Sequence, residues 1–177
     1  MKKKLLWITQ TAVLTALLIT LQALTKAGGQ FITGSFVNAV LAVAVLVAGL
    51  WSGVTVAVIS PFLAFLLGIG PQLVAIIPAI SLGNVVFVVL LSRLCGKNPP
   101  LWRKALAWAG SAGAKFLTLY LVVVQLLCKI LPLKEQQVAT FSAMFSWPQL
   151  VTALIGGGVA LLIAPVLRSS RGISHAP

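Results

Sequence analysis

One lysine in this sequence lies inside an apolar segment, where a charged side chain has a high cost in free energy. Lys115 lies in the middle of a long apolar segment, and the chain has a single acidic residue, Glu135, that could pair with it. Ionisable groups at membrane depth normally face a bundle interior or an aqueous cavity, where they mark substrate, proton or ligand sites. Lys115 is therefore the first candidate for binding an anion, as the counter-charge to a carboxylate or phosphate of a ligand. The alternative is a structural lysine whose ammonium is satisfied by backbone carbonyls and Asn84.

Two polar residues in the preceding apolar segment form a second candidate group. Ser81 and Asn84 are three residues apart, so they share one face of a helix. Pro78 is expected to kink that helix and to free the carbonyl of Val74. Broken helices beside a cavity recur in transporters, which favours a ligand-binding role. The alternative for Asn84 is a hydrogen bond that holds two helices together.

Further candidates for substrate binding lie toward the expected outer ends of the helices. They are polar or aromatic side chains suited to hydrogen bonding or ring stacking: Tyr120, Gln125, Gln30, Thr33, Gln72, Trp147 and Gln149. Trp147 could stack on a planar ligand ring or belong to the aromatic belt of the membrane interface. The glycines at 156–158 predict close helix packing rather than a phosphate cradle, because they lie inside a span.

The scarcity of catalytic residue types narrows the function. Hydrolysis and phosphoryl transfer normally need a carboxylate, an activated nucleophile or a metal, and the chain has one Glu and one His. The phosphate-loop pattern GxxxxGK[ST] is missing, and no cluster of Cys, His and acidic residues supplies a metal site. We therefore expect a binding or conducting protein that is not an enzyme, needs no cofactor or metal, and takes its energy from elsewhere.

The composition indicates an integral membrane protein. Of 177 residues, 60% are hydrophobic and 8% are charged, and the mean hydropathy is +1.11. Soluble domains keep roughly a quarter of their residues charged. The net charge of +12 could indicate nucleic-acid binding, but the basic residues punctuate apolar segments instead of clustering in a recognisable motif. We therefore expect the lipid bilayer as a partner and no nucleic acid.

The apolar segments predict an all-α, polytopic bundle of six transmembrane helices forming a single domain over residues 1–177. The predicted spans are about 5–25, 35–50, 53–69, 72–93, 104–130 and 146–167. The second and third are short and meet at residues 51–53, so they could instead form one re-entrant hairpin, leaving four full spans. The first resembles a signal peptide but is longer than usual, and we expect it to be retained as an anchor.

The basic residues predict the orientation of the bundle in the cell membrane. With six spans and both termini in the cytoplasm, nine basic residues fall inside: Lys2, Lys3, Lys4, Arg93, Lys97, Arg103, Lys104, Arg168 and Arg171. Only Lys26, Lys129 and Lys134 fall outside, as the positive-inside rule requires. Lys115 follows Lys104 by 11 residues, which places it about 16 Å into the membrane.

The first predicted helix carries a pair of small residues, and three further segments have sequences that are informative together with this pair. Ala12 and Ala16 are one turn apart, a spacing that permits close approach either within the bundle or to a partner helix. Together with the six-span layout, this pair and the segments 28–35 (GGQFITGS), 60–65 (SPFLAF) and 81–84 (SLGN) resemble the substrate-binding S component of energy-coupling factor (ECF) vitamin transporters. The resemblance covers about the full length of the chain.

This resemblance implies a function. S components bind a vitamin or other micronutrient in a pocket open to the outside, and a transmembrane coupling protein with two ATPases drives its release inward. It would assign Ala12 and Ala16 to the contact with the coupling protein, and it leaves the substrate unidentified. Two alternatives remain open: a self-sufficient small transporter or channel, and an assembly subunit that binds no ligand.

Overall fold

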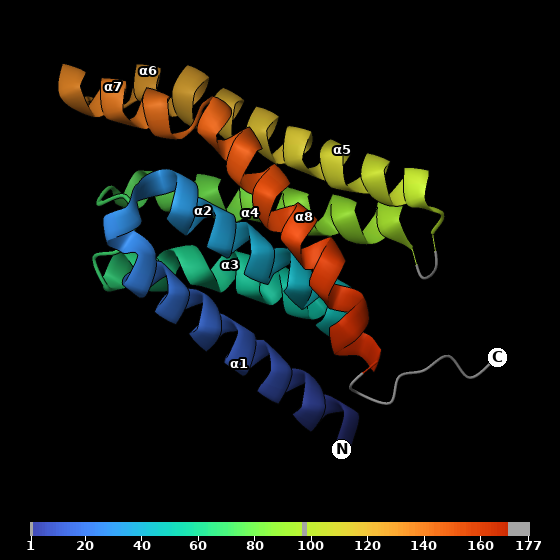
Figure 1. Cartoon of the computed structure of the whole chain (residues 1–177). Coiled ribbons are helices and arrows are strands. Elements are labelled where there is room, and N and C mark those ends of the chain that lie inside the picture. Colours follow the sequence, from blue (N-terminus) through green and yellow to red (C-terminus); the bar gives the residue numbers. More distant parts are fainter. Residues whose placement is uncertain (1, 97–98, 170–177) are drawn as a thin grey trace.

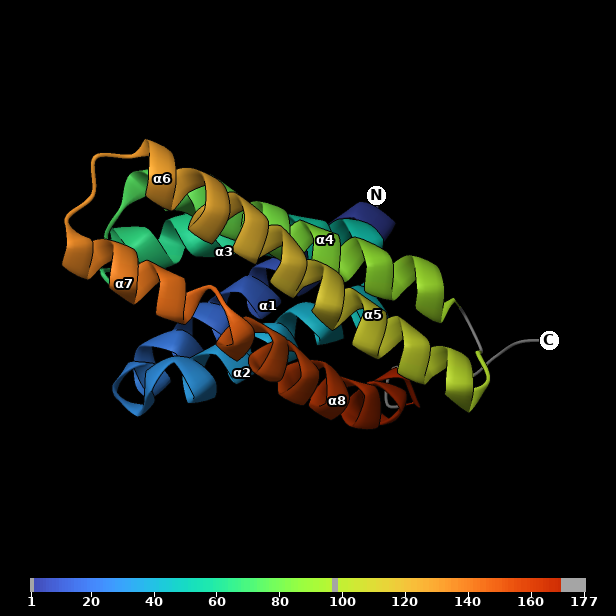
Figure 2. The same cartoon turned by 90° about the horizontal axis from the view of Figure 1, so that it is seen from above.

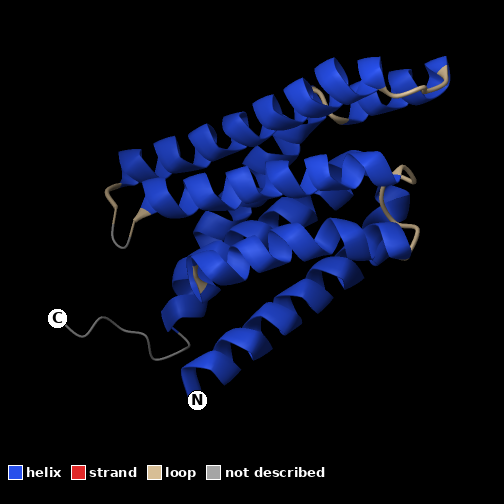
Figure 3. Ribbon diagram, turned by 180° about the vertical axis from the view of Figure 1, so that it is seen from behind, coloured by secondary structure: helices blue, strands red, loops and turns tan. Residues whose placement is uncertain are grey.

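The computed structural model describes residues 2–96 and 99–169, and over these ranges the chain consists of helices joined by short loops, without strands (Figure 3). The predicted all-α class is confirmed. The α-helices are α1 (Lys2–Thr25), α2 (Gly29–Val43), α3 (Leu50–Leu66), α4 (Ile77–Cys95), α5 (Leu101–Leu119), α6 (Cys128–Ile130), α7 (Glu135–Met144) and α8 (Trp147–Ser169). Short 3₁₀ turns cover Lys26–Gly28 and Val74–Ile76, and π-helical segments cover Ala44–Ala48 and Tyr120–Leu127.

Four helical stretches of the described residues are long and apolar enough to cross a membrane: Lys4–Ala48, Val74–Cys95, Leu101–Ile130 and Glu135–Ser169. The apolar helix α3 has only 17 residues and falls short of that length. Helix length and composition therefore support a membrane protein with four candidate spans and do not support the predicted count of six. The reason is that the first two predicted spans are linked by residues that are themselves helical, and that the third is short.

Two glycines turn the chain within the first half of the bundle. Gly29 has φ 77° and Gly49 has φ 96°, values that residues with a side chain rarely adopt. After Gly29 the chain reverses, so that α2 lies beside α1, and after Gly49 it enters α3 (Figure 1). The turn predicted at residues 51–53 is wrong, because Gly49 supplies the turn and these residues already belong to α3.

Other predicted boundaries also need correction. The spans predicted at about 5–25 and 35–50 leave a loop between them, but the chain is helical again from Gly29 onward. The predicted loop between the last two spans contains α7. The predicted kink at Pro78 is wrong, because this proline lies in the first turn of α4, where the missing N–H breaks no helical hydrogen bond. The carbonyl of Val74 accepts a hydrogen bond from the backbone N–H of Ile77.

The two ends of the bundle differ in which segments they gather. The start of α1, the end of α4, the start of α5 and the end of α8 lie at one end, which we call the terminal end (Figures 1 and 2). The α1–α2 turn, the α3–α4 loop and the α6–α7 pair lie at the opposite end, which we call the loop end. The free Cys95 and Cys128 lie toward different ends, at the end of α4 and at the start of α6.

Basic side chains cap helix ends at both ends of the bundle. At the terminal end, Arg103 donates to the carbonyl of Leu94 at 2.9 Å, and Arg168 Nε donates to the carbonyl of Leu46 at 2.8 Å. At the loop end, Lys26 donates to the carbonyl of Gly68 at 2.7 Å. Cations are favourable near helix C-termini, where carbonyls lack partners in the helix. Each contact therefore ties one helix end to another segment.

Candidate functional site

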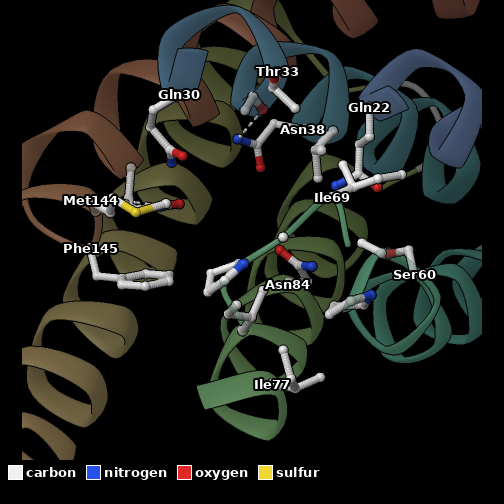
Figure 4. Close-up of a pocket in the computed structure, with 18 of the residues that line it drawn as sticks. Gln22, Gln30, Thr33, Asn38, Ser60, Ile69, Ile77, Asn84, Met144 and Phe145 are labelled. Carbon is white, nitrogen blue, oxygen red and sulfur yellow. Dashed lines mark hydrogen bonds between the residues drawn. The ribbon is translucent and has the colours of Figure 1, made fainter. Parts of the chain in front are cut away.

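A cavity of about 380 Å³ opens among the helices at the loop end of the bundle (Figure 4). Segments far apart in sequence build it: α1, α2, α3, the α3–α4 loop, α4, α5, α7 and α8. Its polar lining consists of Gln22, Gln30, Thr33, Asn38, Ser60, Gln72, Asn84, Lys115, Thr140 and Gln149. Much of its apolar lining comes from Ile77, Ile80, Phe141, Met144 and Phe145. An apolar pocket with a few converging polar groups is the usual form of a small-molecule site.

Lys115 is the only charged residue among those that line the cavity, and it is 3% exposed. Its Nζ donates to Asn38 Oδ1 at 2.6 Å and to Asn84 Oδ1 at 2.7 Å. It also lies 5.7 Å from the centroid of the Phe87 ring, within the range of a cation–π contact. An ammonium has three donors, so two are used by the asparagines and one remains for another acceptor.

Close contact between helix backbones places the two asparagines. A Cβ added at Gly156 of α8 would lie 2.3 Å from the carbonyl oxygen of Ser35 and 2.7 Å from Asn38 Cβ, so only glycine lets α8 approach α2 this closely. Asn38 Nδ2 donates to the carbonyl of Gly34 at 2.9 Å and to Thr152 Oγ1 at 3.3 Å, which turns its Oδ1 toward Lys115. The packing predicted for the glycines at 156–158 is confirmed.

The same principle sets the position of α4 against α5. A Cβ added at Gly83 would lie 2.7 Å from Leu119 Cγ, so the missing side chain brings the two helices together. Asn84 follows Gly83 and is 2% exposed. The close approach therefore holds Asn84 within hydrogen-bond reach of Lys115 on the neighbouring helix.

The charge of Lys115 has no counter-charge at the site. The cavity lining contains no acidic residue, and Glu135, the one carboxylate of the chain, lies in the first turn of α7. Asn38 and Asn84 offer oxygen acceptors but are neutral. A buried cation is costly unless it is paired and hydrogen-bonded. The arrangement therefore suits a ligand that brings its own negative charge to the free donor of the ammonium.

Two other cavity-lining atoms lack partners. Gln22 Oε1 and Ser60 Oγ are buried and form no hydrogen bond with the described part of the chain. Figure 4 shows Gln22 and Ser60 on one side of the cavity and Met144 and Phe145 on the opposite side, with Asn38 and Asn84 between them. The unpaired polar atoms of Gln22 and Ser60 thus face the side chains of Met144 and Phe145 across the cavity.

The structure brings six of the predicted binding residues to the cavity: Gln30, Thr33, Gln72, Asn84, Lys115 and Gln149. The remaining four lie elsewhere. Ser81 donates to the carbonyl of Val58, Gln125 Nε2 donates to the hydroxyl of Tyr120, and the Trp147 ring is 61% exposed and lies 5.3 Å from the Phe31 ring. In the structure these side chains thus contact neighbouring helices or lie on the bundle surface, outside the cavity lining.

Sequence reasoning missed several cavity residues, above all Gln22, Asn38, Ser60 and Thr140. Asn38 could have been found by the argument used for Asn84, because it too interrupts an apolar run. Phe141, Met144 and Phe145 lie in a segment for which the sequence predicts a loop between the last two spans. No residue pattern in the sequence indicates that α7 folds back over the cavity.

A second hollow lies on the outside of the bundle, between α1 and α3. It is an open groove of about 630 Å³ lined by Trp7, Ile8, Thr11, Ala12, Thr15, Ala16, Ile19, Thr20, Thr55, Ile59 and Leu63. Ala12 and Ala16 are both exposed on its floor. Thr11 and Ser52 share a hydrogen bond beneath the groove, and Thr15 donates to the carbonyl of Thr11, so these polar groups are satisfied inside the protein. The surface left to the outside is mainly apolar.

Comparison with known protein families matches residues 7–168 to the family described as ECF transporter, substrate-specific component. Comparisons with curated proteins and with solved structures give no match. The family match spans all four candidate membrane stretches almost completely and includes every residue that lines the cavity. The members of this family are substrate-binding subunits of transporters rather than enzymes, and they work with the other components of the ECF module. This chain belongs to the substrate-specific components of ECF transporters.

Proposed function

We propose that this protein captures a small anionic micronutrient, a vitamin or a related compound, at the outer face of the cell membrane. The observation that carries the proposal is Lys115, a buried lysine that lines a cavity and has no carboxylate near it. A ligand carboxylate or phosphate would supply the missing charge. The asparagines that hold the ammonium would then act as positioning residues for the anion-binding group.

The volume of the cavity supports a small ligand. At about 380 Å³ it lies toward the lower end of the range for ligand pockets, which is roughly 300–1,000 Å³. The apolar side chains of Phe141, Met144 and Phe145 would cover the carbon skeleton of such a ligand.

We further propose that the chain crosses the membrane six times, with both termini in the cytoplasm. The six passes are α1, α2, α3, α4, the α5–α6 segment and α8. The positions of basic residues within the described ranges support this orientation, because basic residues favour the cytoplasmic side. Five lie toward the terminal end, namely Lys4, Arg93, Arg103, Lys104 and Arg168, and three lie toward the loop end, namely Lys26, Lys129 and Lys134. The additional basic residues Lys97 and Arg171 lie outside the described residues. In this orientation the cavity lies on the extracellular half.

Energy for release would come from partner proteins, a transmembrane coupling protein and two ATPase subunits. We propose that the groove with Ala12 and Ala16 contacts the coupling protein, because exposed small residues at this spacing let a partner helix approach closely. The groove is separate from the cavity and shares no lining residue with it. Binding of the micronutrient and binding of the coupling protein would therefore be separable by mutation.

The function is tested by mass spectrometry of the gently purified wild-type protein under native conditions. We expect a co-purified small molecule that carries a carboxylate or phosphate and leaves when the protein is denatured. A wild-type protein that neither carries such a molecule nor takes one up from a deproteinised cell extract would contradict the proposal. A bound molecule without an acidic group would refute the role of Lys115 while leaving capture itself intact.

The groove is tested by the double substitution Ala12→Leu and Ala16→Leu. Both side chains point outward, so we expect normal folding and small-molecule binding but loss of the coupling protein and ATPases from the purified complex. The matched control is Ala105→Leu with Ala109→Leu, a pair of exposed alanines at the same spacing on α5. Equal recovery of the partner proteins with both double variants would show that the groove is not the contact surface.

A further inference from the structure

Gln22 Oε1 and Ser60 Oγ stand out among the buried polar atoms of the described residues, because neither has a hydrogen-bond partner. Ser60 is 2% exposed, and both residues line the cavity. Leaving a buried donor or acceptor unpaired costs about 1–3 kcal/mol, and few such groups occur in folded proteins. Two of them on one side of one cavity need a physical reason.

The hydroxyl of Ser60 has an ordinary partner nearby that it does not use. Hydroxyl groups elsewhere in the helices of this chain donate to the carbonyl one turn earlier, as in Thr9, Thr11, Thr15, Ser35, Thr55 and Thr118. Ser60 lies in α3, so the corresponding carbonyl belongs to Val56, yet no bond forms. The hydroxyl is therefore available to the cavity.

We propose that Gln22 and Ser60 form a second polar subsite of the cavity, which binds an uncharged N–H or O–H group of the substrate. The inference rests on the proposed function, in which Lys115 takes the acidic group. Gln22 Oε1 accepts a hydrogen bond from the substrate, and the Ser60 hydroxyl donates or accepts one. A group with an N–H beside a carbonyl, such as an amide or ureido group, satisfies both side chains together.

The rest of the cavity excludes a cationic group at this subsite, and Gln22 Oε1, as an acceptor, disfavours an anionic one. The lining contains the ammonium of Lys115 and no carboxylate, so a substrate ammonium would be buried without a counter-charge. Met144 and Phe145 face the subsite from the opposite wall and offer only apolar contact (Figure 4). The substrate class is therefore a small acid whose second polar group is neutral and carries a hydrogen-bond donor.

The test uses Gln22→Leu, Ser60→Ala and Lys115→Met, with Ser111→Ala as the matched control. Ser111 is a fully buried serine of α5 that does not line the cavity. Each purified, emptied protein is titrated with a deproteinised small-molecule extract of the source cells, and native mass spectrometry records the bound masses. Thermal unfolding of each protein without extract is measured in parallel.

We expect Gln22→Leu and Ser60→Ala each to need roughly tenfold more extract than the wild type for half occupancy, because each loses one hydrogen bond to the substrate. Their unfolding midpoints without extract should be unchanged or higher, since each change removes an unpaired buried polar atom. A purely structural role predicts the reverse, with lower midpoints. Ser111→Ala should keep wild-type binding.

The possible outcomes separate this inference from the function on which it rests. If the wild type binds a small acid that Lys115→Met loses and both subsite variants retain, the second subsite is refuted and the proposed function stands. Lower midpoints in both subsite variants without weaker binding would refute it as well. If no extract component binds the wild type, the proposed function and this inference fall together.

Discussion

Replacing Lys115 with methionine should abolish retention of the acidic small molecule that we expect in the wild-type protein. Methionine fills nearly the same space without the charge, so the ligand anion would enter a cavity that contains no cation. Losing one partner of a buried, hydrogen-bonded charge pair costs about 2–5 kcal/mol, which corresponds to a loss of affinity of about 30-fold to several thousandfold. Native mass spectrometry of the two proteins, purified side by side, measures this loss.

The fold should largely tolerate this change. The substitution removes a buried cation that has no counter-charge, which offsets the cost of leaving Asn38 Oδ1 and Asn84 Oδ1 without their lysine donor. The matched control is Lys129→Met, which removes a lysine at the loop end whose Nζ contacts Gln125 outside the cavity. The control should retain the small molecule. Wild-type occupancy in Lys115→Met would mean that Lys115 is a structural lysine, the alternative that the sequence left open.

Substituting Gly156 with alanine is the change expected to disturb the fold most. The new Cβ would lie 2.3 Å from the carbonyl oxygen of Ser35 and 2.6 Å from the backbone nitrogen of Ala39, and neither backbone atom can rotate away. Overpacking of this kind costs about 1–3 kcal/mol, occasionally more. Because α2 must retreat from α8, Asn38 should also move away from Lys115. We expect a lower unfolding midpoint together with weaker binding.

The control for this substitution is Gly113→Ala in α5. A Cβ at Gly113 meets no atom within 4 Å, so its midpoint should stay the same or rise, as alanine favours the helix. Unfolding in detergent or lipid nanodiscs, followed by intrinsic tryptophan fluorescence, measures both variants. If Gly156→Ala unfolds at the wild-type temperature, the close contact of α2 and α8 does not determine the position of Asn38.

The sequence predicted part of the candidate site. Lys115 and Asn84 were found because a polar residue in an apolar segment is costly unless it has partners. The same reasoning applied to Asn38 would have found the third member of this cluster. Ser81, Tyr120 and Gln125 satisfy the same sequence criterion but lie outside the cavity, where each hydrogen-bonds within the protein. Polarity in a span shows that a residue needs a partner, but it does not show which one.

The sequence was also a poor guide to where the helices begin and end. Hydropathy identified the apolar segments, yet the turn between α2 and α3 lies at Gly49 rather than at residues 51–53. The sequence contains glycine at both places, and only the backbone angles distinguish the one with positive φ from the one buried inside a helix. Gly53 is needed for packing instead, since a Cβ there would lie 2.8 Å from Val45 Cβ.

By itself the sequence predicted an all-helical membrane protein with few residues of the types used in catalysis and with one lysine, Lys115, inside an apolar segment. These properties depend on composition and on local hydropathy, which do not require knowledge of how the helices pack. The tertiary structure decided that Lys115 meets Asn38, which is 77 positions away, and that Gln22 and Ser60 of two other helices line the same cavity. The helical period determines which residues share a face, but glycine contacts between helices determine where each face points.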